Sequence, residues 1–148
     1  MSLKEYLDYI KEMNLLIEIK EPVKKNLEIA EYLCKYREKA VLFLDIVDSD
    51  YSLIGNTLTS RKQLEVILDS TNIHQAFEQK IENKISPKKI TNEHLEEIPV
   101  NLFNLPIPKF FSTDGGQYLT AGLVFTKFSE GKRTNGSIHR IMITEKNR

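Results

Sequence analysis

An apolar run at residues 40–47, Ala-Val-Leu-Phe-Leu-Asp-Ile-Val, restricts the fold of this chain more than any other segment. Asp45 is the one polar residue within it. A run of this kind is typical of a β-strand that is covered on both faces, as in a sheet flanked by helices. The sequence therefore predicts a sheet with helices packed against it.

The neighbouring segments predict those helices and further strands. Apolar residues recur at helical spacing over residues 3–13, and a third helix, capped by Thr59 or Ser60, continues through Leu68. Between them, the predicted N-cap Asn26 begins a second helix. The expected buried positions of the second and third helices are Leu27, Ile29, Ala30, Leu33, Cys34, Leu64, Ile67 and Leu68. Shorter apolar stretches at 15–19 and 51–55 predict strands, and the resulting order indicates an α/β (α+β) fold class.

The chain changes character after residue 70. Residues 70–100 are polar, and we expect a helix over 74–81 followed by a surface excursion and a proline-rich extended path. Residues 117–128 and 138–144 are rich in β-formers, with a turn at 129–132, so they predict a β-hairpin that opens a second, β-rich domain. Because a lone hairpin is marginal in water, we expect this sequence to be incomplete at its C-terminus.

Composition excludes several classes of protein. Lys and Arg total 21, as do Asp and Glu, and this zero net charge argues against a nucleic-acid partner held by charge alone. No apolar run approaches the ~20 residues of a membrane span, and the charged N-terminus is not a signal peptide. Cys34 is the only cysteine, which excludes an internal disulfide and a cysteine-rich zinc site, and we expect it in the core. The sequence thus predicts a cytoplasmic protein.

The segment Thr-Asn-Gly-Ser-Ile-His-Arg at residues 134–140 concentrates the chemically useful side chains. Asn-Gly is a strong hairpin-turn signal, and that is the purely structural interpretation. The same groups could instead hold a phosphate through hydroxyl and guanidinium donors, or ligate a hard metal through the Asn oxygen. Strand alternation places Asn135, Ser137 and His139 on one face and Arg140 on the other. A bulge or twist, which we predict at Gly136, would be needed to unite them.

Other motifs favour structural roles. Asp114-Gly115-Gly116 predicts a tight turn in which the glycines supply positive φ. It is neither a dinucleotide-binding fingerprint nor a P-loop. His74 and His94 lie in polar surroundings, where we expect them to be exposed, and no catalytic Ser-His-Asp or Cys-His arrangement stands out.

Two motifs stand in order along the chain. The first runs from Pro108 to Gly122 and contains an Asp-Gly-Gly turn and a Thr-x-Gly strand, and the second is the Asn-x-Ser-x-x-Arg stretch that ends at Arg140. Together they resemble the UbiD-like carboxy-lyase family. Residues 27–30, 41–43 and 53–56 are similar to the family's N-terminal half. The resemblance implies an N-terminal α/β domain over residues 1–105. It also implies that residues 106–148 are the incomplete start of a split β-barrel that binds a flavin.

The resemblance further implies a lyase that catalyses reversible, non-oxidative decarboxylation of an α,β-unsaturated or aromatic carboxylic acid. Its cofactors are prenylated FMN, a divalent metal (usually Mn²⁺) and K⁺. Asn135 corresponds to a metal ligand, Thr120 and Ser137 to cofactor contacts, and Arg140 to a catalytic and cofactor-binding residue in an ionic network with glutamates. His139 before the arginine is similar to archaeal members, some of which decarboxylate a phosphorylated mevalonate derivative in isoprenoid biosynthesis.

The family's other metal ligands and its acid–base Glu lie downstream of every position in this sequence. We therefore expect the N-terminal portion, or a split subunit, of such a decarboxylase, inactive by itself. The full enzyme would form a homo-oligomer, or a complementing subunit would supply the missing residues. The alternative is a non-catalytic binding or assembly subunit that keeps the fold without the catalytic residues.

Overall fold

The computed structural model describes residues 2–83, 85–86, 98–128 and 134–148. The chain divides into two compact units. The first comprises Met1–Ile19, Tyr36–Leu42 and Ile54–Pro99, and the second comprises Lys20–Lys35, Phe43–Leu53 and Val100–Arg148. The predicted turn at 129–132 and His94 lie outside the described residues.

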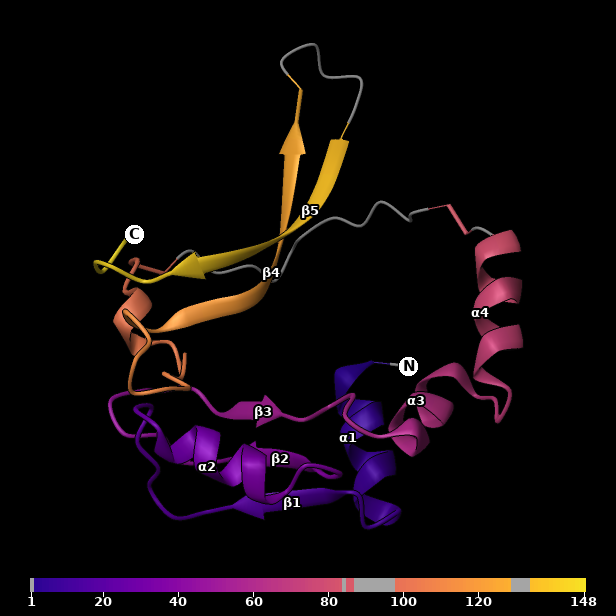
Figure 1. The fold of residues 1–148 in the computed structure, drawn as a ribbon, viewed down its shortest axis with the longest axis horizontal. Helices are drawn as coiled ribbons and strands as arrows, with labels where there is room; N and C mark the ends of the chain where they lie inside the picture. Colours follow the sequence, from indigo (N-terminus) through magenta and orange to yellow (C-terminus); the bar gives the residue numbers. More distant parts are fainter. Residues whose placement is uncertain (1, 84, 87–97, 129–133) are drawn as a thin grey trace. The chain divides into compact units, whose positions relative to one another are not determined.

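The N-terminal part of the chain forms a small mixed α/β layer (Figure 1). Its strands β1 (Leu16–Ile19), β2 (Ala40–Phe43) and β3 (Leu53–Gly55) make a sheet in the order β1-β2-β3. Helix α1 (Leu3–Glu12) begins in a capping box in which Ser2 and Glu5 each bond the other's backbone N–H. Tyr6 and Ile10 of this helix are buried with Ala40, and Leu7, Leu15, Leu16, Ile54 and Val66 pack against them. The predicted α/β (α+β) class is confirmed.

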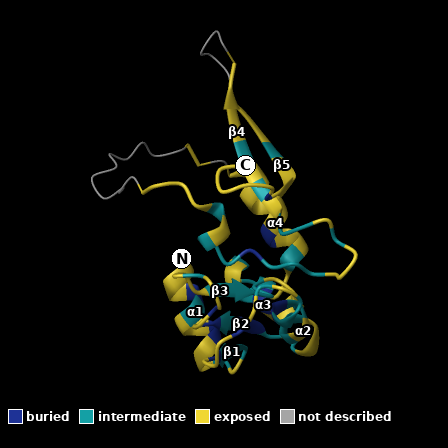
Figure 2. Ribbon diagram, turned by 90° about the vertical axis from the view of Figure 1, so that its left-hand side faces the viewer, coloured by how far each residue is buried: buried dark blue, intermediate teal, exposed yellow. Residues whose placement is uncertain are grey.

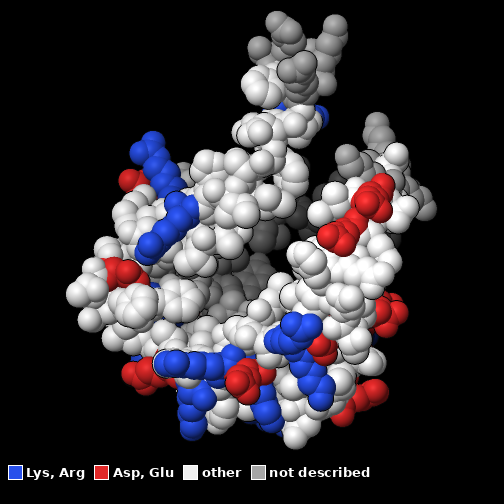
Figure 3. Space-filling view, turned by 45° about the vertical axis from the view of Figure 1, so that its right-hand side comes forward, with Lys and Arg blue, Asp and Glu red and all other residues white. Residues whose placement is uncertain are grey.

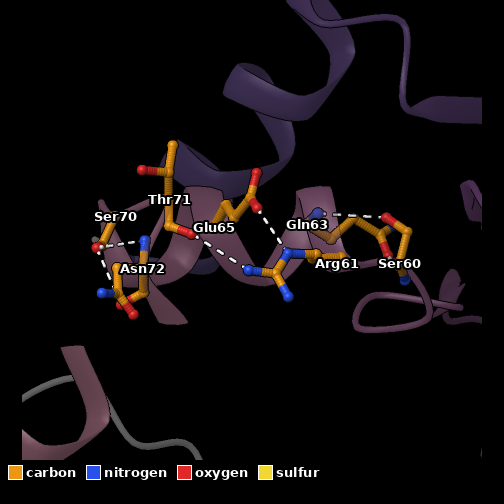
Figure 4. A network of polar contacts seen from close by, with 7 residues as sticks. All are labelled: Ser60, Arg61, Gln63, Glu65, Ser70, Thr71 and Asn72. Carbon is orange, nitrogen blue, oxygen red and sulfur yellow. Dashed lines mark hydrogen bonds and ion pairs between the residues drawn. The ribbon is translucent and has the colours of Figure 1, made fainter. Parts of the chain in front are cut away.

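Two helices follow the sheet along the chain, α3 (Arg61–Leu68) and α4 (Ile73–Glu82). Ser60 caps α3, and the buried Gln63 side chain accepts the backbone N–H groups of Thr59 and Ser60. Arg61, the first residue of this helix, donates to Glu65 one turn later and to the Thr71 carbonyl beyond the end of the helix (Figure 4). No helix in the described ranges has the length and apolar character that crossing a membrane requires.

The second unit contains helix α2 (Glu28–Lys35), the 3-10 helix η1 (Leu102–Asn104) and the strands β4 (Tyr118–Lys127) and β5 (Thr134–Met142). Its segments are joined at Lys25, whose Nζ donates to the carbonyl oxygens of Asp48 at 2.6 Å and Phe103 at 2.7 Å. The backbone of Lys25 also accepts the N–H of Lys109. Burial lowers the pKa of the Lys25 ammonium, but these carbonyls replace the water that it loses.

The long apolar run forms a shorter strand than its sequence predicts. Strand β2 ends at Phe43, and Leu44 and Val47 are exposed. Ile46 is buried but pairs with Val23 in an isolated bridge, and Asp48 then takes a left-handed φ of 60°. A turn that redirects the chain therefore divides the run into a strand and an irregular segment.

Some helix predictions also need correction. Helix α2 begins at Glu28 rather than directly after the predicted N-cap Asn26, because Leu27 has a positive φ of 70° and its N–H donates to the Lys109 carbonyl. Cys34, expected in the core, is exposed, and so is Ile67. Ile29 is the residue of α2 that is fully buried.

Replacing Lys25 with Met should lower the free energy of unfolding by about 1–2 kcal/mol, because two carbonyls lose a charged donor. Lys24→Met is the matched control, since the exposed Lys24 pairs with Glu28 at 3.4 Å on the surface. Urea unfolding, monitored by circular dichroism, measures the free energy of unfolding of both variants. Equal losses for the two variants would contradict the role assigned to Lys25.

Candidate functional site

The residues predicted to carry the chemistry lie on the antiparallel hairpin of β4 and β5 (Figure 1). Its pairs run from Tyr118 opposite Met142 to Lys127 opposite Thr134. Most of its side chains are exposed, whereas buried residues gather around α1, β1 and β2 (Figure 2). The hairpin therefore offers its polar groups to whatever binds it.

The register contains one irregularity, and it lies opposite Arg140. Leu119 pairs with Ile141 and Gly122 pairs with His139, so Thr120 and Ala121 together oppose the single residue Arg140. Two residues facing one define a β-bulge, which bends its strand and redirects side chains. The hairpin therefore contains a bulge, but on β4 and not at the predicted position on β5.

The predicted place of the bulge, Gly136, is wrong. Gly136 pairs regularly with Phe125. A Cβ at position 136 would lie 3.3 Å from Cε1 of the Phe125 ring, so the glycine leaves room for that ring. Close approach of an aromatic side chain, and not a change of register, accounts for this glycine.

Three polar side chains share one face of β5. The strand is regular from Thr134 to His139, so Asn135, Ser137 and His139 point to the same side, as predicted. The Ser137 hydroxyl and Nε2 of His139 are 2.8 Å apart and hydrogen-bonded. Ser137 is half-buried, and Asn135 and His139 are exposed. This face presents an amide, a hydroxyl and an imidazole in a row.

Arg140 lies on the opposite face, against two residues that precede the bulge. Its Cζ is 4.2 Å from the centroid of the Tyr118 ring, which is the geometry of a cation–π contact. Its Nη2 is 3.7 Å from Oδ1 of Asp114. The side chain of Arg140 is 58% exposed and that of Asp114 is 17% exposed. The structure thus holds Arg140 from one side and leaves the other open.

Asp114 is itself fixed by a local turn. Its Oδ2 accepts the Phe111 N–H at 3.0 Å, and its own N–H donates to the Phe111 carbonyl. Gly115 and Gly116 do not adopt the positive φ that the sequence suggests. Cβ atoms built at these glycines would meet Met142 at ordinary contact distance. The turn packs against the end of β5.

The predicted site residues are therefore brought onto one hairpin but not onto one face. Thr120 lies in the bulge opposite Arg140, while Asn135 and Ser137 lie on the other side of β5. Sequence reasoning missed Asp114 and Tyr118 as contacts of Arg140. Without the bulge, the alternation of side chains along β4 gives no reason to expect Tyr118 beside Arg140.

Charged side chains outside the hairpin bear on a second candidate site in two ways, by their distribution on one face and by their ability to hold a metal. Basic and acidic side chains are interspersed on the face shown in Figure 3. The residues that the structure describes contain no group of three or more His, Cys, Asp and Glu able to hold a metal. His74 is exposed, as predicted, and pairs with Glu78 across one helical turn.

Comparison with known proteins agrees with this fold. Residues 7–81 match the 3-octaprenyl-4-hydroxybenzoate carboxy-lyase N-terminal domain, and residues 82–148 match the Rift-related domain of the same carboxy-lyase. The anhydromevalonate phosphate decarboxylase of Methanosarcina mazei is 33% identical, and the alignment covers 100% of this chain and 35% of the relative. That of Methanothermobacter thermautotrophicus is 26% identical over 95% of this chain and 34% of the relative.

Solved structures show the same fold. The UbiD-class enzyme HmfF from Pelotomaculum thermopropionicum, in complex with FMN, superposes with a TM-score of 0.88 at 20% identity, covering 98% of this chain and 35% of that one. Vanillic acid decarboxylase from Sedimentibacter hydroxybenzoicus gives a TM-score of 0.83 at 23% identity, with 97% and 34% covered.

The chain spans about a third of the length of the curated relatives it matches. The two family matches follow one another without a gap from residue 7 to residue 148. They also assign the α1–α4 region and the β4–β5 hairpin to successive domains of one kind of enzyme. This chain belongs to the UbiD family of carboxy-lyases.

Proposed function

We propose that this chain forms part of the cofactor site of a prenylated-FMN-dependent decarboxylase acting on an α,β-unsaturated or aromatic carboxylic acid. One observation carries the proposal: the hairpin segment matched by the carboxy-lyase domain presents Asn135 and Ser137 in a row and Arg140 opposite a bulge. The HmfF structures, solved with FMN or with prenylated FMN, support the choice of cofactor.

The polar row on β5 suits the phosphate end of a flavin nucleotide. The Ser137 hydroxyl can donate to a phosphate oxygen, and the Asn135 amide oxygen is a ligand of the kind that Mn²⁺ accepts. Thr120 adds a second hydroxyl on β4. One amide oxygen is too few for Mn²⁺ or K⁺, so the remaining ligands must come from another part of the whole protein. The described donors fit part of the site and supply one of its edges.

Arg140 suits the end of the flavin nucleotide that carries the ring system, where the substrate would react. It lies five residues from Asn135, about 17 Å along an extended strand, and a flavin nucleotide carries its phosphate and its ring system at opposite ends. A β-bulge increases the local twist of a hairpin, and the bulge on β4 lies directly opposite Arg140. The guanidinium can bind the substrate carboxylate and orient a neighbouring acid. Bound prenylated FMN would supply the electron sink for cleavage of the C–C bond.

The names of the curated relatives suggest a substrate and a metabolic setting. Several curated relatives are anhydromevalonate phosphate decarboxylases, so we propose a phosphorylated mevalonate derivative as the substrate and isoprenoid synthesis as the setting. We also propose a cytoplasmic enzyme, with a boundary near residue 105 between the α/β domain and the barrel domain. In its complete form it would assemble as a homo-oligomer or with a complementing subunit.

Asn135→Ala in the whole protein should lose bound metal and flavin together, because the metal holds the phosphate and Asn135 holds the metal. Metal analysis and the flavin absorbance of the purified protein measure both. Asn101→Ala is the control, since that exposed side chain makes no capping hydrogen bond to η1. Normal metal and flavin content in the Asn135 variant would contradict this assignment.

Arg140→Ala should retain flavin but lose roughly 10²-fold in turnover, the scale expected when one preorganised donor is removed. Arg140→Lys should recover only part of the rate, because an ammonium lacks the planar fork. Lys127→Ala, which removes a cation from the same face of the hairpin, serves as the control. The turnover of anhydromevalonate phosphate is measured as the rate of CO2 release. Unchanged turnover in Arg140→Ala would remove Arg140 from the site.

A further inference from the structure

We propose that Asp114 and Tyr118 are positioning residues for Arg140, and that the bulge at Thr120 and Ala121 makes their contact with it possible. The inference deepens the proposed function and rests on it for the role of Arg140. The contacts themselves can be tested independently of that role.

The register explains why Tyr118 reaches Arg140. Tyr118 pairs with Met142, which is two residues from Arg140 on a regular stretch of β5, so all three share a face. Beyond the bulge, Leu123 pairs with Ile138 on that same face. In an unbroken strand, Tyr118 and Leu123 would point to opposite faces because they are five positions apart, an odd number. The extra residue in the bulge puts the ring of Tyr118 and the apolar surface beyond it on the side of Arg140.

The two contacts restrict the guanidinium in complementary ways. Cζ of Arg140 lies over the Tyr118 ring, 4.2 Å from its centroid, so the ring face covers one side of the charged group. A ring face attracts the guanidinium through its charge and supplies no lone-pair acceptor, so the five N–H donors stay available to other groups. Tyr118 thus holds the guanidinium in place without using its hydrogen-bonding capacity.

Asp114 restricts the position of the same group. The separation of 3.7 Å between Oδ1 and Nη2 is longer than a hydrogen bond, so the attraction is electrostatic. The Phe111 N–H donates to the other carboxylate oxygen at 3.0 Å, so Asp114 is held independently of Arg140. The Phe111–Asp114 turn, the Asp114 carboxylate, the Arg140 guanidinium and the Tyr118 ring therefore form one connected set.

The experiment compares Tyr118→Leu and Asp114→Asn with Tyr118→Phe in the holoenzyme. Leu removes the aromatic face, Asn removes the charge but can still accept the Phe111 N–H, and Phe keeps the ring. We expect Tyr118→Leu and Asp114→Asn to lower kcat/KM for anhydromevalonate phosphate about fivefold, the fold-change of a cation–π contact at a partly exposed site, with normal flavin content. Tyr118→Phe should match the wild type.

A double-mutant cycle distinguishes positioning from a general structural effect. In the Arg140→Ala background, Tyr118→Leu should have no further effect on kcat/KM. A fivefold loss that persists there, or a Tyr118→Leu variant as active as the wild type, would overturn the inference.

A second readout does not depend on turnover. In holoenzyme labelled with ¹⁵N at arginine Nε, the Arg140 signal should carry a ring-current shift that Tyr118→Leu abolishes and Tyr118→Phe preserves. An Arg140 signal unchanged by Tyr118→Leu would overturn the contact. If the shift behaves as expected while Arg140→Ala remains fully active, the proposed function fails and the contact stands.

Discussion

The bulge opposite Arg140 is the constraint on which the candidate site depends. Thr120 and Ala121 occupy the space of one residue, and this extra residue reverses which side chains of β4 lie beside Arg140. It brings Tyr118 against the guanidinium and leaves Asn135 and Ser137 undisturbed on the other face of β5. A regular hairpin of the same sequence would place Leu119 on the face of Arg140, where an aliphatic side chain provides neither a ring nor a charge.

Other segments of the second unit contact each other and the end of this hairpin. Gly115 and Gly116, which follow the Phe111–Asp114 turn, lie beside Met142 at the end of β5. Leu102 donates its N–H to the Lys146 carbonyl beyond that strand. Lys25 then ties η1 to the segment that precedes α2 through backbone carbonyls. Each of the hydrogen bonds in this set has a backbone group on at least one side, so together they fix the path of the chain.

Local patterns in the sequence predicted the helices, strands and caps well. They predicted the end of β2, the burial of single side chains and the position of the bulge less well. Helix α1, the Ser60 cap, the hairpin and the alternation of Asn135 and Ser137 all follow from spacing and capping chemistry, which act over a few residues. The early end of β2, the exposed Cys34 and the bulge depend on contacts between distant segments, such as Val23 with Ile46, which no local pattern encodes. Recognition of the family came from ordered motifs, and the position of Asp114 beside Arg140 needed the structure.

A crystal structure of the whole protein with prenylated FMN and Mn²⁺ tests the central claim most directly. We predict that the Asn135 oxygen coordinates the metal and that Ser137 contacts the phosphate end of the flavin. We also predict that the Arg140 guanidinium remains against Tyr118 and donates toward the flavin ring and the substrate. A flavin bound elsewhere, with Asn135 and Arg140 both in solvent, would contradict it.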